Sequence, residues 1–131
     1  PSNVEVPTDS VIKWGYELEN FLWKNHRQIE YFENELLVVN AYCFRGDISL
    51  GVDRVHRMVD TSVKKQSSLG FALACVGIGD TYHYSNMVTE AIELYSDALE
   101  TLEGLPNTIK YQKITILKML HAFLTQDDKK K

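Results

Sequence analysis

Glycine and proline are scarce in this chain, with 7 and 3 of them among 131 residues. The turn-forming Gly46, Gly104 and Pro106 fall between segments of regular hydrophobic spacing. Strand signals are weak and occur only at Val38–Val39 and in Phe71–Ile78. Because no alternating partner segments accompany them, a β-sheet domain is excluded and an all-α fold is predicted.

Cysteine and clustered positive charge are also scarce. The only two cysteines, Cys43 and Cys75, stand among apolar residues of predicted helices, so we expect buried free thiols rather than a disulfide scaffold or a CxxC metal site. The formal net charge is −4, and the only basic run is Lys129–Lys131. This balance argues against direct binding of nucleic acid through this chain.

Long apolar runs are missing as well. No apolar run is long enough to cross a bilayer as a helix and no signal peptide is recognisable, so we expect no membrane contact and a cytoplasmic protein. Because the chain starts with Pro1, we expect a processed chain or a piece of a longer protein.

Enzyme motifs are the last absence. The chain has no GxSxG motif, no phosphate-binding glycine loop and no recognisable carboxylate pair, and GIGD at 77–80 lacks the preceding strand of a nucleotide-binding loop. The histidines, which are His26, His56, His83 and His121, show no metal-ligand spacing. We therefore expect no enzyme, no cofactor and no metal.

Hydrophobic residues at helical spacing fill most of the chain. They predict six helices, at about 9–24, 27–44, 48–64, 68–84, 87–103 and 107–124. We expect them to form a single domain over residues 1–126. Residues 127–131 are expected to be a basic disordered tail.

The segment Cys75–Glu103 predicts a helix, a tight turn and a second helix that pack against each other. Small and aromatic residues stand at matching intervals along it: Gly79, Tyr82, Ala91, Tyr95 and Ala98. Small residues allow two helix axes to approach, and aromatic side chains fill the space beside them. The segment therefore predicts a closely packed helical hairpin.

This hairpin resembles the tetratricopeptide (TPR) repeat. When Gly79 is set over Val39, the hairpin aligns with an earlier stretch of the chain, which gives a degenerate second unit. The aligned positions are Val39, Tyr42, Gly51, Val55 and Met58. The proline expected after the second helix is displaced to Pro106. The resemblance implies antiparallel helical hairpins stacked as a short right-handed solenoid of about six helices.

A narrower resemblance covers Glu33–Asn86. This run is similar to the repeat region of Gram-positive cytosolic peptide-pheromone receptors, and most similar to the arbitrium-type receptors of temperate phages. The resemblance implies that a short imported peptide binds in a TPR groove. That family carries an N-terminal helix-turn-helix, whereas the chain up to His26 forms one amphipathic segment without a basic cluster. It therefore implies a fragment, or a relative without the DNA-binding part.

The TPR resemblance also implies which residues face the concave groove. They flank the consensus tyrosine of the first helix of each hairpin, here Tyr82. They are Asp80, His83 and Tyr84 in one unit, and Asn40, Cys43 and Phe44 in the other.

Five of these residues are the predicted binding site. The amide of Asn40 both donates and accepts, so it could hold an extended peptide backbone. Asp80 could hold a peptide N-terminus or a basic side chain, and Phe44 and Tyr84 would supply apolar contact. His83 could make binding sensitive to pH. The alternative is that Asn40 and Asp80 are hydrated or cap a turn, and that His83 is a polar surface residue.

Aromatic residues near the start of the chain have two roles in this hypothesis. Trp14 and Phe21 stand seven positions apart on the apolar side, so we expect both to hold the first helix against the second. Trp23 falls outside that stripe and is the predicted interface residue, for a missing domain or a second subunit.

The resulting hypothesis is a helical module that binds a peptide or protein segment, as the ligand-sensing part of a cytosolic regulator. One alternative is a structural domain that self-associates into a homo-oligomer of a larger assembly, through Trp23 and the last helix. Another is a small TPR-type chaperone that holds an unfolded client.

Overall fold

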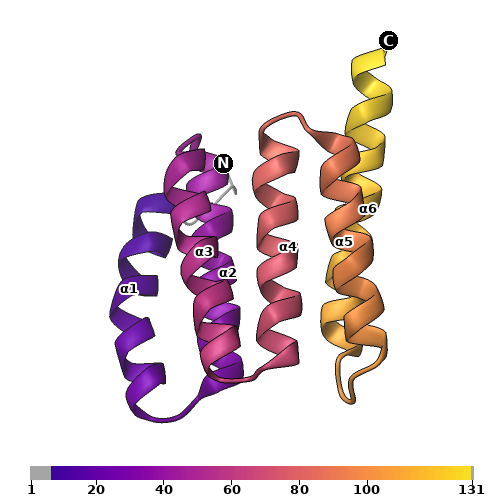
Figure 1. The fold of residues 1–131 in the computed structure, drawn as a ribbon. Coiled ribbons are helices and arrows are strands. Elements are labelled where there is room, and N and C mark those ends of the chain that lie inside the picture. The colour runs from indigo at the N-terminus through magenta and orange to yellow at the C-terminus, as the bar shows by residue number, and fades with distance from the viewer. Residues whose placement is uncertain (1–6, 131) are drawn as a thin grey trace.

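The structure is a computed structural model that describes residues 7–130, with side chains up to Gln126. Within that range the chain folds into six α-helices (Figure 1). Their bounds are α1 Thr8–Lys24, α2 Gln28–Arg45, α3 Ile48–Lys64, α4 Ser68–Tyr84, α5 Val88–Glu103 and α6 Ile109–Lys130. The prediction of an all-α fold with six helices is therefore confirmed.

The last helix is longer than predicted. We expected it to span 107–124, whereas α6 starts at Ile109 and continues to Lys130. No glycine or proline follows Pro106, and the hydroxyl of Thr125 donates to the carbonyl of His121 within the helix. Residue 131 and the side chains from residue 127 onward lie outside the described part, so the basic tail at 127–131 stays a prediction.

The helices pack as sequential antiparallel pairs. Each helix contacts the next one along the chain, and α2 also packs against α4. Because consecutive helices alternate in direction, α2, α4 and α6 run parallel to one another (Figure 1). Three helices far apart in sequence therefore contribute side chains to the same side of the molecule.

The first four connections are built in the same way. Each contains one residue in the left-handed backbone region, at His26, Gly46, Gln66 and Asn86. The following backbone N–H then donates at 2.9 Å to a carbonyl five positions earlier, which is the Schellman pattern. The accepting residues are evenly spaced along the chain, at Leu22, Tyr42, Ser62 and Tyr82. The second and the fourth of them, Tyr42 and Tyr82, are the two tyrosines that the sequence alignment of the hairpins superposes.

Small and aromatic residues pack between α4 and α5 as predicted. Ala91, Tyr95 and Ala98 on α5 are fully buried. A Cβ atom added to Gly79 on α4 would lie 2.5 Å from Cε1 of Tyr95. The missing side chain of Gly79 is therefore what allows the Tyr95 ring to pack against the α4 backbone.

The prediction that Trp14 and Phe21 belong to the core is wrong. Their exposed fractions are 57% and 56%. The inner face of α1 is formed instead by Ile12, Gly15 and Leu22. A Cβ added to Gly15 would lie 2.3 Å from Cγ2 of Val38, so α1 approaches α2 through this glycine and Trp14 is turned away.

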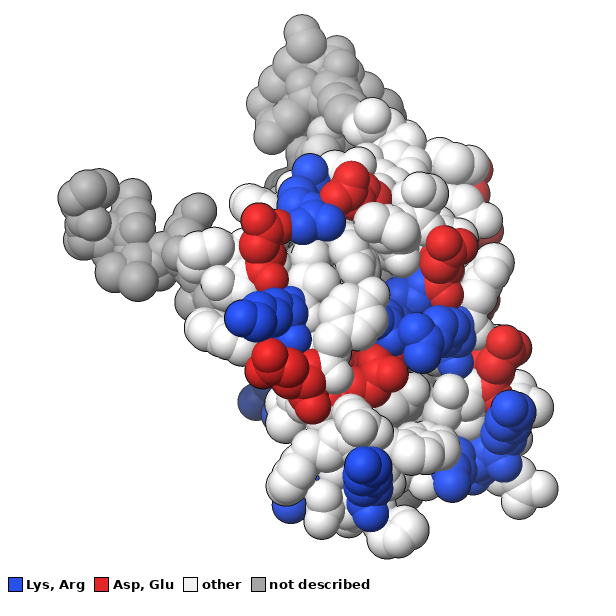
Figure 2. All heavy atoms as spheres, turned by 90° about the vertical axis from the view of Figure 1, so that its left-hand side faces the viewer, with Lys and Arg blue, Asp and Glu red and all other residues white. Residues whose placement is uncertain are grey.

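The face of the molecule where α1 lies carries charges of both signs (Figure 2). Arg45 pairs with Asp9, and Nη2 of Arg57 lies 3.4 Å from Oε1 of Glu19. Among the described residues, this face therefore shows no continuous basic patch of the kind that binds phosphate backbones.

No helix within residues 7–130 has both the length and the apolar character needed to cross a lipid bilayer. The two cysteines are free, with Cys43 buried and Cys75 partly buried. Burial raises the pKa of the Cys43 thiol to about 12, so this thiol is protonated and inert at neutral pH.

Candidate functional site

A groove of about 460 Å³ lies between α2, α4 and α6. Its walls and floor are mostly apolar, with Leu36 and Leu37 from α2, Leu73 from α4 and Ile114 from α6. Polar side chains reach the groove at two levels along the helix axes. The size and the apolar lining are typical of a site for a small ligand or a short chain segment.

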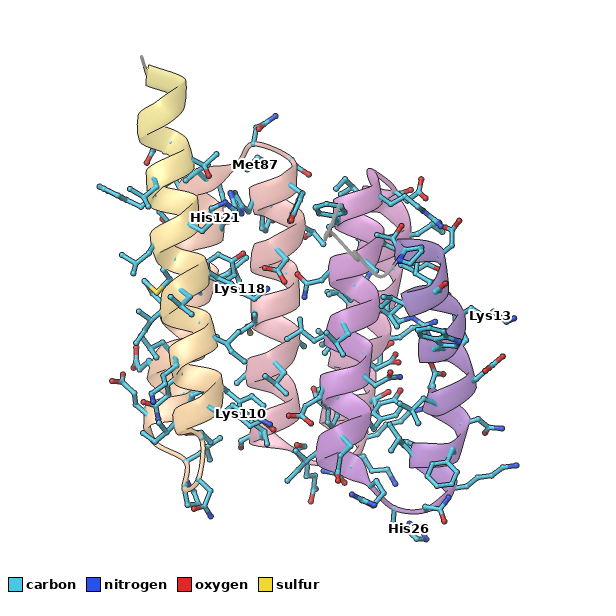
Figure 3. All side chains as sticks on the ribbon, turned by 180° about the vertical axis from the view of Figure 1, so that it is seen from behind. Lys13, His26, Met87, Lys110, Lys118 and His121 are labelled. Atoms are coloured by element: carbon cyan, nitrogen blue, oxygen red, sulfur yellow. The ribbon has the colours of Figure 1, made fainter. Side chains whose placement is uncertain are left out.

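The first polar group is the Lys118 bridge, formed by Asn40, Asp80 and Lys118. Nζ of Lys118 donates to Oδ1 of Asn40 at 3.1 Å and to the two carboxylate oxygens of Asp80 at 2.8 and 3.0 Å. Lys118 comes from α6, Asn40 from α2 and Asp80 from α4. Figure 3 shows Lys118 on the side of α6 that faces α4. This single ammonium group therefore joins all three helices of the groove.

A buried tyrosine supports the Lys118 bridge from below. The hydroxyl of Tyr95 on α5 donates to Oδ1 of Asp80 at 2.6 Å. Burial, followed by the nearby Asp80 carboxylate, raises the pKa of Tyr95 far above its ordinary value, so this hydroxyl is always a donor. The side chain of Asp80 is only 3% exposed, and that of Lys118 is 22% exposed. Lys118 and Asn40 are therefore the members of the bridge that line the groove, whereas Asp80 lies beneath them.

The second polar group is the Glu33 bridge, formed by Glu33, Lys110 and Tyr111. Oε2 of Glu33 on α2 accepts from Nζ of Lys110 at 2.6 Å and from the hydroxyl of Tyr111 at 2.7 Å. Burial and this carboxylate raise the pKa of Tyr111. Both partners lie on α6, so the two walls of the groove are connected at this level too.

An aromatic group lies past the Lys118 bridge, toward the C-terminal ends of the three helices. Phe44 on α2 and Tyr84 on α4 are 65% and 41% exposed. The ring centroids of His83 and His121 lie 5.0 Å apart, and those of His83 and Tyr84 lie 5.6 Å apart. These side chains are not among the residues that line the groove, but they offer exposed ring faces from two helices just beyond it, with a histidine pair beside them.

The structure brings together most of the residues predicted from the sequence. Asn40 and Asp80 share Lys118, and Phe44, His83 and Tyr84 lie on the same helices one turn further along. Asp80 lies beneath Lys118, so a ligand ammonium group would have to displace Lys118 to reach it.

Sequence reasoning missed Lys110, Lys118 and Glu33. Lys110 and Lys118 stand eight positions apart in a helix whose exposed side chains are otherwise largely apolar. Eight positions are about 2.2 helical turns, so the two side chains point about 80° apart and share one broad side of the helix. This spacing is the signal that could have indicated a second wall of the groove.

Trp23, the predicted interface residue, lies away from the groove. Its side chain is 43% exposed, and its ring centroid is 5.1 Å from that of Tyr31. Nζ of Lys65 lies 4.5 Å from the centroid of the Trp23 ring, a cation–π contact. Trp23 is thus half-packed against α2 and the end of α3, and its role as an interface stays a prediction.

The groups that line the groove are suited to binding. Lysine ammonium groups donate hydrogen bonds, the carboxylates that they contact accept them, and the floor excludes water from apolar groups. No group of three His, Cys, Asp or Glu side chains that could hold a metal ion occurs in the part of the chain that the structure describes.

Comparison with protein-family models, with curated proteins and with solved structures finds no match to this chain. The function of this chain is therefore inferred from the groove and its residues.

A second buried group of charges, the Arg54 cluster, lies between α1, α2 and α3. It consists of Glu19, Glu35 and Arg54. Nη1 of Arg54 donates to Oε2 of Glu19 at 2.7 Å and to Oε1 of Glu35 at 3.1 Å. Glu35 is completely buried and Arg54 is 2% exposed. One guanidinium group thus serves two carboxylates, so the more buried carboxylate is expected to hold a proton.

We expect the free energy of unfolding to fall as the pH rises from about 4.5 to 7. Burial raises the pKa of Glu35 from 4.5 to about 7 in the folded chain, more than Arg54 lowers it. Folded molecules therefore hold a proton that unfolded ones release, and this stabilisation, about 3 kcal/mol, is lost as the pH rises through 7. Urea unfolding at several pH values measures it. Glu35→Gln mimics the protonated form and should flatten the dependence. An unchanged slope in that variant would show that Glu35 is not its source.

Proposed function

We propose that this chain is a helical repeat module of the TPR type that binds a peptide or protein segment in the groove between α2, α4 and α6. The evenly spaced connections after α1, α2, α3 and α4 support a repeat of two helices. The packing of α2 against α4 is consistent with a short solenoid in which the first helix of each hairpin lines one surface.

One observation carries the proposal: an apolar groove connected across its walls by two polar bridges. Burying one leucine-sized side chain on Leu36, Leu73 and Ile114 would contribute about 1.5–3 kcal/mol to binding. Lys118, which faces the groove, would donate to a carbonyl or carboxylate oxygen of the ligand. A peptide has a carbonyl acceptor beside every side chain, so any apolar residue of a peptide offers both an anchor and an acceptor.

The bridges also indicate how a bound peptide could act on the whole domain. The Lys118 and Glu33 bridges connect α6 to α2, which is separated from α6 by three helices along the chain. A ligand that competes for either lysine would favour a different spacing of α6 from α2 and α4. In a repeat protein, a small change of helix spacing in each hairpin adds up along the chain, so binding in the groove would alter the arrangement of distant helices.

We expect Ile114→Arg to abolish peptide binding without unfolding the chain. Ile114 lines the groove and its side chain is 40% exposed, so arginine would fill the apolar floor with charge at little cost to the fold. The expected loss is at least about 2 kcal/mol, roughly 30-fold in the dissociation constant. Calorimetry with peptides selected on the wild-type chain measures the loss, and circular dichroism checks the fold.

Ile116→Arg is the matched control and also tests the main alternative. Ile116 is 42% exposed on another side of α6, close to Leu120 and Phe123, which are exposed as well. This apolar side of α6 favours self-association as the second candidate function. If peptide binding survives Ile116→Arg and is lost in Ile114→Arg, the groove is the binding site. If Ile114→Arg leaves binding intact while Ile116→Arg dissociates an oligomer in sedimentation experiments, self-association replaces the proposal.

A further inference from the structure

Three layers of side chains line the groove, and a fourth lies beyond the last of them, toward the C-terminal ends of α2 and α4. The first is the Glu33 bridge and the second is apolar, with Leu36, Leu37, Leu73 and Ile114. The third is the Lys118 bridge and the fourth is aromatic, with Phe44, Tyr84 and the His83–His121 pair. Polar and apolar layers thus alternate in the direction of the helix axes.

Residues four positions apart on the parallel helices generate these layers. On α2 the positions are Leu36, Asn40 and Phe44. On α6 they are Lys110, Ile114 and Lys118. Four residues of an α-helix rise by about 6 Å. Glu33 of the first layer lies three positions before Leu36, so successive layers are about 4.5–6 Å apart along these helices.

An extended peptide has nearly the same repeat. Its side chains return to the same face every second residue, after about 6.6–6.8 Å. A peptide that lies along the groove would therefore present residues i, i+2, i+4 and i+6 to successive layers. From Glu33 to Phe44 the four layers span about 16.5 Å, against about 20 Å for seven extended residues, and side-chain flexibility absorbs the difference of about 3–4 Å.

From this match we infer that the groove, if it binds peptides as proposed above, selects an extended peptide with a fixed pattern on one face. Residues i and i+4 carry hydrogen-bond acceptors, and residues i+2 and i+6 carry apolar side chains. The acceptors, acidic or amide, face the Glu33 and Lys118 bridges. An aliphatic residue enters the compartment between the bridges, and an aromatic residue lies on Phe44 and Tyr84.

The charges that face the groove give the acceptor positions their chemistry. Lys110 is the most exposed member of its bridge, with 65% of its side chain exposed, against 30% for Glu33. In the other bridge Lys118 covers the buried Asp80. A ligand therefore meets an ammonium group at both polar layers, and an ammonium group can only donate.

The test is a selection of random peptides of about seven residues, the length that covers four layers, on the full chain. We expect enriched sequences to share the alternating pattern and to lose binding to Ile114→Arg. Enriched sequences that bind in the groove without any two-residue alternation would overturn the inference and leave the proposed function standing. If no peptide is enriched over the Ile114→Arg chain, both fail.

A second measurement tests whether the aromatic residue of the peptide contacts Phe44. In the best selected peptide, replacing the aromatic residue by serine should weaken binding to the wild-type chain about tenfold. The same replacement should have a much smaller effect on the Phe44→Ala chain, because only the contact with Tyr84 remains there. The control is Phe123→Ala, which removes a ring that is 54% exposed outside the groove. Equal losses on the wild-type and Phe44→Ala chains would contradict the layer assignment.

Discussion

Arg54→Leu is expected to lower the free energy of unfolding by about 3–5 kcal/mol, a large part of the stability of a domain of this size. Arg54 is 2% exposed and donates to both Glu19 and Glu35. Leucine would leave Glu35 completely buried without a counter-charge, and Glu19 with only the exposed Arg57 as its partner. Urea unfolding followed by circular dichroism measures the loss.

Arg57→Leu is the matched control for Arg54→Leu. Arg57 lies on the same helix and contacts the same Glu19, at 3.4 Å, but its side chain is 58% exposed. An exposed pair of this kind contributes at most about 1 kcal/mol. We also expect Arg54→Leu to cost less in a Glu35→Gln background, because fewer carboxylates are then left unpaired. Equal costs for Arg54→Leu and Arg57→Leu would mean that the cluster is hydrated rather than buried.

The helices were predictable from the sequence because local signals fix them. Hydrophobic spacing and turn residues place α1 to α5 within about two residues of their observed bounds. The even spacing of the connections was not predicted, because Gln66 is an unusual residue for a left-handed turn, unlike Gly46 and Asn86.

The orientation of α1 could not be predicted because two apolar stripes on it compete. Trp14 and Phe21 mark one stripe, and Ile12 and Leu22 mark the other. The second is buried because Gly15 lets α1 contact α2, where Nδ2 of Asn34 donates at 2.9 Å to the carbonyl of Gly15. A glycine contact and a buried amide hydrogen bond therefore determine which stripe is buried, and neither can be recognised from the hydrophobic spacing.

The candidate site was predictable only where the hairpin pattern itself fixed positions. Asn40 and Asp80 occupy equivalent places in α2 and α4, so the pattern placed them on a common surface. Lys118 and Lys110 lie on α6, outside the aligned hairpins, and which face of α6 points inward depends on its packing against α5. The half of the site that α6 contributes is therefore a result of tertiary packing.

The second large effect is expected from Tyr95→Ala, which should lower the free energy of unfolding by about 3–5 kcal/mol. The Tyr95 ring is completely buried and packs against the backbone of α4 at Gly79, which has no side chain of its own to fill the space. Alanine would leave a cavity between α4 and α5. It would also remove the hydroxyl that supports Asp80.

Tyr95→Phe separates these two contributions, because it keeps the ring and removes only the hydroxyl. We expect it to cost about 1.5–3 kcal/mol, the value of a hydrogen bond to a charged group. Tyr84→Ala is the control: this tyrosine is on α4, is 41% exposed and should change stability by less than about 1 kcal/mol. If Tyr95→Ala costs no more than Tyr95→Phe, the ring does not hold the hairpin together. Since Asp80 also orients Lys118, Tyr95→Phe should weaken peptide binding as well, which would connect the hairpin core to the groove.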